Sequence, residues 1–340
     1  RVSPAWETSL LARDITAALA GNGPTLGFGE VSSEFGPSQA AVVIGTSGTT
    51  GAPKEIFLSS HALVASARAS NAFVGAKLGD TWSLLLPLTH VAAVNVFVRA
   101  FELGTIPVDL RNHSGEYPRV NFTAIVPTQL FRALNGDEQL LKHLQGAQKV
   151  LVGGAALSSA IRNQATAAGI NVVTTYGMSE TSGGCVYNGE ILEGAEVEVR
   201  GGSIFIRGSV LALNLELSDG WFETNDLGEF VDEKLVVIGR SDDVIISGGE
   251  NLSLNSVENI LSQSFPESQF AAFSVEDPQW GQTLHIAVVG EADSGSISSV
   301  LEEKVGAFAK PKGIHSLKSL PLLGIGKVDR KRLAQEIPNE

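Results

Sequence analysis

The sequence predicts an α/β protein with a large N-terminal domain of mostly parallel sheets covered by helices, a small antiparallel β subdomain and a smaller, mobile α+β C-terminal lid. Three observations lead to this class. Short apolar, β-branched runs alternate with helix-like stretches between about residues 40 and 175, which is typical of parallel sheets. From residue 189 to 239, short strands are separated by Gly, Asp and Asn turns. Helices and strands are mixed again beyond residue 239, over a normal domain length.

The expected N-terminal strands are short apolar runs bounded by turn residues. They cover residues 41–44, 82–86, 105–109, 124–126, 149–152 and 171–174. The stretches between them predict helices at residues 59–74, 92–103, 128–134 and 158–168, with Ser158 as an N-cap. Because ligands collect at the carboxyl ends of parallel strands, a site is expected in the loops that follow these strands.

The second half of the chain divides at residues 239–241. The first domain is expected to span residues 1–239, with the β subdomain at 189–239, and the second to span residues 240–340. The β subdomain is expected to hold strands at residues 191–199, 203–207, 229–231 and 235–238. Beyond it we expect helices at 253–265 and 297–308, and strands at 269–275, 283–289 and 313–316.

Composition excludes several classes of function. The 37 acidic and 24 basic residues give a net charge of −13, which argues against a nucleic-acid or anionic-membrane surface. No apolar run approaches the roughly 20 residues that span a bilayer, and no signal-peptide pattern is seen. The single cysteine, Cys185, excludes an intrachain disulfide and favours a reducing, cytoplasmic location. Met178 is the only methionine, so we expect a trimmed N-terminus; the sequence leaves open a homo-oligomer.

The most informative segment is the loop at residues 46–54, which reads TSGTTGAPK. It follows an apolar run and offers backbone N–H groups, hydroxyls and one lysine, which suit an anion such as a polyphosphate. It is not the usual P-loop, because Ala52 and Pro53 separate Gly51 from Lys54. A Gly/Ser/Thr surface turn is the alternative interpretation.

Four further segments occur in a fixed order after this loop. They read TYGMSET at 175–181, WFETNDLG at 221–228, GRSDDVIISGGE at 239–250 and GKVDR at 326–330. Together with the loop they resemble the signatures of the acyl-adenylate-forming enzymes, the AMP-dependent synthetases and ligases. This resemblance implies two steps. A carboxylate attacks the α-phosphorus of ATP and releases pyrophosphate, and a thiol, usually that of coenzyme A, then displaces AMP.

The resemblance also implies a nucleotide site. Glu180 would hold Mg²⁺ and Ser179 would reach the α-phosphate. Tyr176 would lie against adenine, and Asp226 and Arg240 would bind the ribose. The β- and γ-phosphates would be wrapped by Thr46, Ser47, Gly48, Thr49, Thr50 and Gly51, with charge from Lys54. The base would approach the backbone at Gly153, Gly154, Ala155 and Gly177.

The C-terminal motifs imply the catalytic and moving parts. Lys327 would bridge the acyl carboxylate and the α-phosphate in the first transition state. Asp242 would be the hinge between an adenylating and a thioester-forming pose. Gly249 would approach the pantetheine arm in the second pose. His90 matches a position that gates the acyl pocket, although a buried structural histidine is an equal alternative.

The acid pocket is expected around Arg99, Ser182 and Gly183. An arginine in the apolar stretch 91–98 needs an anionic partner or must reach water, and it could bind a second substrate carboxylate. The short chain, the PLTHVAA segment at 87–93 and the run at 176–187 resemble the compact actinobacterial type of 2-succinylbenzoate–CoA ligase, of menaquinone biosynthesis. The alternatives are a CoA ligase for another aryl or acyl acid, an adenylation domain serving a carrier protein, and a non-catalytic nucleotide-binding homologue.

Overall fold

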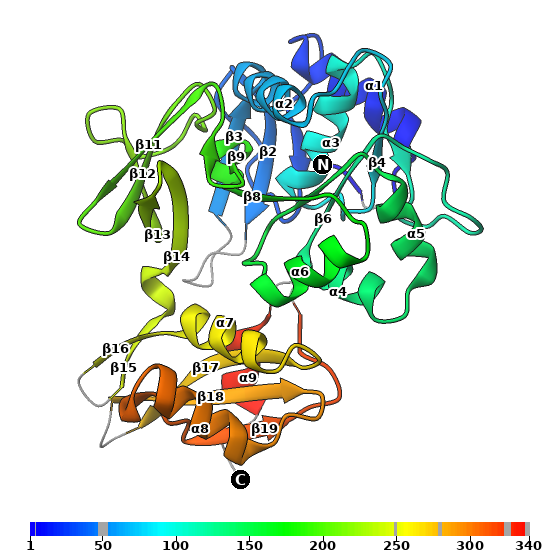
Figure 1. The fold of residues 1–340 in the computed structure, drawn as a ribbon. Helices are drawn as coiled ribbons and strands as arrows, with labels where there is room; N and C mark the ends of the chain where they lie inside the picture. Colours follow the sequence, from blue (N-terminus) through cyan, green and yellow to red (C-terminus); the bar gives the residue numbers. More distant parts are fainter. Residues whose placement is uncertain (4, 47–53, 248–249, 278–280, 323–327, 337–340) are drawn as a thin grey trace.

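Figure 1 shows the fold, a mixed α/β arrangement of helices on β-sheets. The structure is a computed structural model, and it describes residues 1–3, 5–46, 54–247, 250–277, 281–322 and 328–336. Within these residues the strands form sheets of three, seven, four and five strands. The mixed α/β class expected from the sequence is confirmed. None of the described helices is long and apolar enough to cross a bilayer.

The seven-stranded sheet has the order β10-β9-β8-β7-β6-β4-β5. Strands β4 to β8 are parallel, whereas β9 and β10 are antiparallel additions at one edge. The strands are β4 (Trp82–Leu84), β5 (Val108–Asp109), β6 (Phe122–Ile125), β7 (Lys149–Val152), β8 (Val172–Met178), β9 (Gly183–Tyr187) and β10 (Glu190–Ile191). The alternation of strands and helices therefore predicted the parallel centre correctly.

Helices cover both faces of this sheet (Figure 1). One face packs on α2 (Ser60–Val74) and α3 (Val91–Glu102), and the other on α4 (Pro127–Leu134), α5 (Glu138–Gly146) and α6 (Ser159–Ala167). Strand β6 serves both layers, since Phe122 and Ala124 join one apolar cluster and Ile125 the other. Burial on both faces explains why this strand is a continuous apolar run.

Local signals set the helix ends. The Ser59 side chain accepts a hydrogen bond from the backbone N–H of Ala62 at 3.1 Å and so caps α2. Helix α2 ends at Gly75, whose φ of +75° suits glycine. The expected cap of α6 is confirmed, because Ser158 accepts from the N–H of Ile161 at 3.3 Å.

A three-stranded sheet carries the loop singled out in the sequence. Strand β2 (Ala40–Thr46) pairs in parallel with β1 (Leu26–Phe28) and antiparallel with β3 (Lys54–Ser59). Helix α1 (Thr8–Leu19) packs on the same apolar cluster. The sequence did not predict β1, β3 or α1.

A four-stranded antiparallel sheet follows, in the order β11-β12-β13-β14. The expected strand at residues 191–199 is wrong, because Gly194 turns with φ +84° and separates β10 from β11. The strands are β11 (Ala195–Arg200), β12 (Ser203–Gly208), β13 (Phe222–Val231) and β14 (Lys234–Arg240). A small antiparallel sheet in this region agrees with the expectation.

The C-terminal part is a five-stranded sheet with helices (Figure 1). The described hydrophobic clusters each draw their residues from one side of residue 240. The hairpin of β15 and β16 was not predicted. The elements are the turn η2 (Ser241–Asp243), β15 (Val244–Ser247), β16 (Glu250–Ser253), α7 (Leu254–Ser264), β17 (Gln269–Asp277), β18 (Gly281–Val289), α8 (Ser294–Lys304), the turn η3 (Ala307–Ala309), β19 (Gly313–Ser316) and α9 (Arg330–Glu336).

Candidate functional site

The loop rich in glycine and hydroxyls connects two paired strands. Thr46, at the end of β2, pairs with Lys54, at the start of β3, and the Thr46 hydroxyl donates to the Lys54 carbonyl oxygen at 3.0 Å. The two ends of the loop are therefore held together by a β-ladder. The expected phosphate contacts at Ser47, Gly48, Thr49, Thr50 and Gly51 lie outside the described residues.

Lys54 and Glu180 meet beside this loop although 126 positions separate them in the sequence. The Lys54 Nζ lies 3.7 Å from Glu180 Oε1, and the carboxylate side chain is only 18% exposed. Glu180 belongs to the turn η1 (Ser179–Thr181), which continues directly from β8. The buried Thr181 hydroxyl fixes this turn by accepting from the N–H of Met178 at 2.9 Å. A cation and a carboxylate thus stand at the end of β8 with Ser179 next to them.

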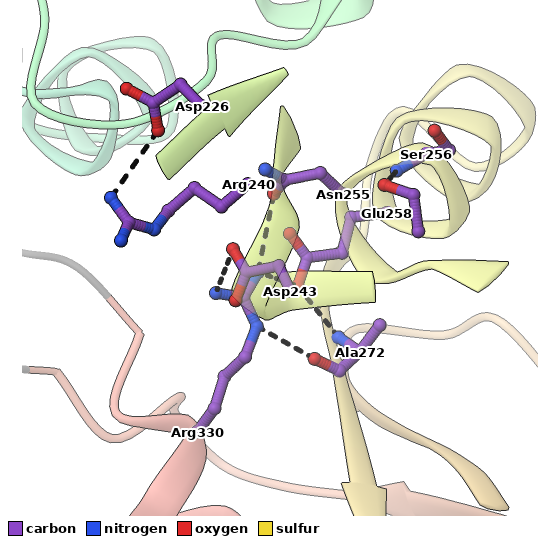
Figure 2. Close-up of polar contacts among 9 residues, drawn as sticks. Asp226, Arg240, Asp243, Asn255, Ser256, Glu258, Ala272 and Arg330 are labelled. Carbon is purple, nitrogen blue, oxygen red and sulfur yellow. Dashed lines mark hydrogen bonds and ion pairs between the residues drawn. The ribbon is translucent and has the colours of Figure 1, made fainter. Parts of the chain in front are cut away.

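A second polar group joins three strands. The Tyr176 hydroxyl in β8 donates to Asp226 Oδ2 in β13 at 2.9 Å, and Arg240 Nη1 at the end of β14 lies 3.4 Å from Asp226 Oδ1. Figure 2 shows the Asp226–Arg240 contact. Burial raises the pKa of the Tyr176 hydroxyl, and the nearby charge of Asp226 raises it further, so the phenol stays protonated and donates. The strand expected at residues 171–174 is longer than predicted, because β8 runs from Val172 to Met178 and contains Tyr176.

Gly153 and Gly154 follow β7, the strand beside β8. A Cβ atom at residue 153 would lie 2.1 Å from the Thr175 hydroxyl, so only glycine lets the two strand ends approach this closely. Gly154 has a φ of +84° and the next residue, Ala155, is exposed. Gly177 lies inside β8 and pairs with Gly184 of β9. Glycines therefore allow close approach of the backbone at the ends of β7 and β8.

Arg99 is buried in α3, with 5% of its surface exposed. Its Nη2 donates to the Tyr187 hydroxyl at 3.0 Å, and its guanidinium lies 5.1 Å from the Trp82 ring centroid. The Tyr187 hydroxyl also shares a 2.9 Å hydrogen bond with Ser70 of α2. No carboxylate of the described residues pairs with Arg99, and its buried Nε has no hydrogen-bond partner among them. A charged group without a counter-ion in such a position is costly, so an anionic ligand would complete it.

Ser182 and Gly183 lie against the same helix. Asn95, one turn before Arg99, donates from Nδ2 to the Ser182 carbonyl oxygen at 2.8 Å. A Cβ at residue 183 would be 2.0 Å from that amide nitrogen, and the φ of Gly183 is +104°, so glycine is required here. The structure thus brings together the expected residues Arg99, Ser182 and Gly183 through Asn95.

Unsatisfied buried polar atoms gather on this side of the molecule. They come from α2, α3 and the turn before β9, which pack against one another. In the described residues these atoms are Ser66 Oγ, Asn95 Oδ1, Arg99 Nε and Ser182 Oγ. Buried polar groups nearly always have partners, so such a cluster indicates a polar ligand. The sequence prediction missed Asn95 and Tyr187; the i, i+4 spacing of Asn95 and Arg99 on an apolar helix was the available signal.

The remaining expected residues are placed less fully. His90 directly precedes α3, where its carbonyl oxygen accepts from the N–H of Ala93 at 3.1 Å. Asp242 lies in the turn η2 between β14 and β15. Gly249 and Lys327 lie outside the described residues. The described residues contain no group of three metal-ligating side chains, so a metal beside Glu180 would take most ligands from its substrate.

Comparison with known proteins identifies the family. A model of the AMP-binding enzyme family matches residues 7–207. A protein of Mycobacterium tuberculosis named "Probable 2-succinylbenzoate--CoA ligase" is 36% identical over 329 residues, with 88% of this chain and 85% of that protein covered. The 2-succinylbenzoate--CoA ligase of Listeria monocytogenes is 29% identical over 337 residues, covering 88% of this chain and 70% of the relative.

Solved structures share the fold. The o-succinylbenzoate CoA synthetase of Bacillus subtilis, in complex with an acyl-adenylate intermediate, has a TM-score of 0.74 and 24% identity, covering 89% of this chain and 72% of that one. ATP-bound MatB from Rhodopseudomonas palustris has a TM-score of 0.77 and 21% identity, covering 90% and 70%. The family model matches more than half of the chain, so the chain belongs to the AMP-binding enzyme family.

Proposed function

We propose that this chain is an ATP-dependent acid–CoA ligase and that its acid is 2-succinylbenzoate, which would place it in menaquinone biosynthesis. The first step joins a carboxylate oxygen of the acid to the α-phosphorus of ATP and breaks the bond to pyrophosphate. In the second step the CoA sulfur attacks the acyl carbon, AMP leaves, and the thiol proton is lost. The relatives that carry this name support the proposal, since one is 36% identical over most of both chains.

The observation that carries the choice of acid is the buried, under-satisfied Arg99. 2-Succinylbenzoate has two carboxylates, so the one that does not react is free to bind a guanidinium. Arg99 Nε and Asn95 Oδ1 have no described partner, and they project from one helix beside Ser182. An acid with a single carboxylate would leave the arginine uncompensated. We therefore assign Arg99, Asn95, Ser182 and Gly183 to the acid pocket.

The nucleotide would occupy the ends of β2, β7 and β8. The loop at 46–51 would hold the β- and γ-phosphates, and Tyr176 would pack near the base. Asp226 is well suited to accept hydrogen bonds from the ribose hydroxyls, because Tyr176 and Arg240 keep its carboxylate oriented. Gly153 to Ala155 offer exposed backbone beside them.

Mg²⁺ fits the residues at the end of β8. One carboxylate, Glu180, together with phosphate oxygens is a common way of binding this ion, and Lys54 lies within 4 Å to add positive charge on the phosphates. When bound, the ion would supply charge neutralisation on the phosphates. The chain's own residues Lys54 and Ser179 would orient the same oxygens.

The C-terminal domain would supply Lys327 for the first step and withdraw it for the second, with Asp242 as the hinge and Gly249 near the pantetheine arm. The separate apolar clusters on either side of residue 240 support a division into domains at 1–239 and 240–340. His90 is proposed to border the acid pocket, since it precedes the helix that carries Arg99. We propose a cytoplasmic location, where ATP and CoA are available.

A turnover panel tests the proposal. The protein is incubated with ATP, Mg²⁺ and single carboxylic acids, and pyrophosphate release is measured with and without CoA. We expect 2-succinylbenzoate to support turnover and its two monomethyl esters to be poor substrates. Turnover with a different acid would replace the substrate assignment, and no pyrophosphate release with any acid would contradict the ligase function itself.

A further inference from the structure

Arg330 begins α9, three positions after Lys327 in the sequence, and it contacts three separate elements (Figure 2). Its Nη2 lies 2.9 Å from Glu258 Oε1 of α7, and its Nε donates to the Ala272 carbonyl oxygen of β17 at 2.9 Å. Its Nη1 lies 3.8 Å from Asp243 Oδ2 in the turn η2. One guanidinium thus joins the start of the last helix to the turn that contains Asp242.

Glu258 is built into this arrangement rather than placed beside it. Its Oε1 also accepts a hydrogen bond from the backbone N–H of Ala272 at 2.8 Å. Glu258 therefore binds the N–H, and Arg330 the carbonyl oxygen, of the same residue in β17. Burial raises the pKa of the Glu258 carboxyl, and the charge of Arg330 opposes this rise. Arg330 is therefore the cation that favours the charged form of this partly buried carboxyl.

The backbone next to Arg330 is fixed as well. Leu322 and Val328 form an isolated antiparallel bridge, and the N–H of Asp329 donates to the Pro321 carbonyl oxygen at 2.9 Å. Leu333 of α9 is buried in an apolar cluster with Phe273. Residues 328–333 are consequently held by both backbone and side-chain contacts.

We propose that Arg330 is a positioning residue for adenylation: it holds residues 328–336, which follow Lys327 in the sequence, against the turn Ser241–Asp243. The inference rests on the proposed function, in which Lys327 serves the first step and Asp242 is the hinge. Without the contacts of Arg330, a rotation at the hinge would no longer carry the C-terminal segment to the same position. A displacement of about 1 Å at a reacting group can cost on the order of 100-fold in rate.

The test compares Arg330→Met with Arg332→Met in the full chain. Arg332 lies on the same short helix, but it pairs with Glu336 on the surface, where both side chains are more than half exposed. We expect Arg330→Met to lower the rate of acyl-adenylate formation by about 10- to 100-fold at an unchanged KM for the acid. The rate of thioester formation from preformed acyl-adenylate should change less than about threefold. Arg332→Met should match the unmodified protein in both half-reactions.

Rescue separates positioning from loss of folding. Arg330→Lys keeps the charge but loses the planar guanidinium, so its adenylation rate should lie between that of Arg330→Met and that of the unmodified protein. If Arg330→Met does not fold, the double variant Glu258→Gln with Arg330→Met removes both charges of this partly buried pair and leaves neither without its counter-ion. Its adenylation rate should remain low. Equal losses in both half-reactions, or a double variant with a normal adenylation rate, would overturn the proposal.

Hydrogen exchange gives a readout that does not depend on activity. In Arg330→Met, backbone exchange should rise in residues 241–247 and 328–336 together, whereas Arg332→Met should leave residues 241–247 unchanged. Unchanged exchange at the turn would show that Arg330 does not connect it to the C-terminal segment. If the unmodified protein forms no acyl-adenylate with any acid, the proposed function fails, yet this exchange experiment still decides whether the connection exists.

Discussion

Arg99 is buried, whereas Arg330 is partly buried with 27% of its side chain exposed, and the surroundings of the two are opposite. Arg99 is 5% exposed and binds a single protein oxygen, that of Tyr187, while its Nε has no described partner. Arg330 is surrounded by Glu258, Asp243, Asn255 and the Ala272 carbonyl oxygen. The difference teaches how to separate binding from structure. A guanidinium whose hydrogen bonds are supplied by the protein holds the fold, and one left under-satisfied is set up for a ligand.

The same change, Arg to Met, should therefore act on different quantities at the two positions. Methionine keeps much of the side-chain volume and removes the charge. At residue 330 it leaves the partly buried Glu258 without its cation, whereas at residue 99 it removes a charge that has no counter-ion among the described residues. A crossed pair of measurements, of stability and of substrate binding on both variants, tests the comparison directly.

The largest expected effect is on the stability of Arg330→Met. Removing one partner of this partly buried ion pair leaves the hydrogen-bonded charge of the other without its partner, which we expect to lower the free energy of unfolding by about 3 kcal/mol. Chemical denaturation checks this, with Arg332→Met as the control. The control pair is exposed on both sides, so its change should stay within about 0.5 kcal/mol. Equal destabilisation by the two changes would show that Arg330 contributes no more than a surface arginine.

Arg99→Met should have the next largest effect, and on binding. We expect the KM for 2-succinylbenzoate to rise by about 10- to 100-fold, which corresponds to losing one charge-assisted contact of roughly 1.5–3 kcal/mol. The KM for ATP should stay unchanged, because the described contacts of the Arg99 guanidinium are with Tyr187 and Trp82 and not with the Asp226 group.

Stability provides the contrast with residue 330. Replacing an uncompensated buried charge by an apolar side chain is neutral or stabilising, so Arg99→Met should unfold no earlier than the unmodified protein. Steady-state kinetics and a melting curve on the same preparation give both numbers. An unchanged KM for the acid would remove Arg99 from the acid pocket, and a marked loss of stability would assign it to the fold.

Tyr187→Phe should produce a smaller change at the same place. The Tyr187 hydroxyl bridges Arg99 and Ser70, so its loss frees the guanidinium without removing the charge. We expect a three- to tenfold rise in the KM for the acid, from one hydrogen bond of about 1 kcal/mol. Ser70→Ala is the matched control, because it removes the other side of the bridge and leaves the contact to Arg99. If both variants behave alike, orientation of Arg99 by Tyr187 is not what the pocket needs.

The sequence alone predicted the parts of the fold whose signals are local. A strand that is buried on both faces is a continuous apolar run, so Phe122–Ile125 could be recognised from the sequence. Ser158 is a typical N-cap residue and indicated the start of a helix. Strand β3 was missed because Lys54 and Glu55 open it, and only Ile56 and Leu58 of its six residues are buried. The hairpin of β15 and β16 was missed for a similar reason, since only Ile245 and Leu252 of its strand residues are buried.

The site divides in the same way. Sequence motifs indicated four residues of the nucleotide site, because each lies in a short segment that resembles a signature of the family: Tyr176, Glu180, Asp226 and Arg240. What they contact could not be predicted, since Asp226 follows Tyr176 by 50 positions and the two are joined only by tertiary structure. The partners of Arg99 and Arg330 were missed for the same reason. Tyr187 is 88 residues from Arg99, and Glu258 is 72 residues from Arg330. No periodicity within a segment reports such contacts.

The smallest expected effect concerns the pH dependence of stability, and Glu258→Gln measures it. Because burial raises the pKa of Glu258 in the folded protein, the folded state holds this proton more tightly than the unfolded chain does. That contribution to stability is full below the ordinary glutamate pKa and is lost as the pH rises through the folded-state value. The unmodified protein should therefore lose stability relative to Glu258→Gln as the pH rises through this range. The difference between their free energies of unfolding should then level off above the folded-state pKa of Glu258.

The matched experiment is a series of denaturation curves for both proteins from mildly acidic to neutral pH. Glutamine keeps the shape and an oxygen for the Ala272 N–H and for Arg330, so only the titration is removed. Arg99 has no carboxylate partner among the described residues, so Arg99→Met should track the unmodified protein with a constant offset across the same range. A difference between the unmodified protein and Glu258→Gln that changes in the opposite direction would mean that Arg330 outweighs burial at this carboxylate. The charge of Arg330 would then lower the pKa of Glu258 by more than burial raises it.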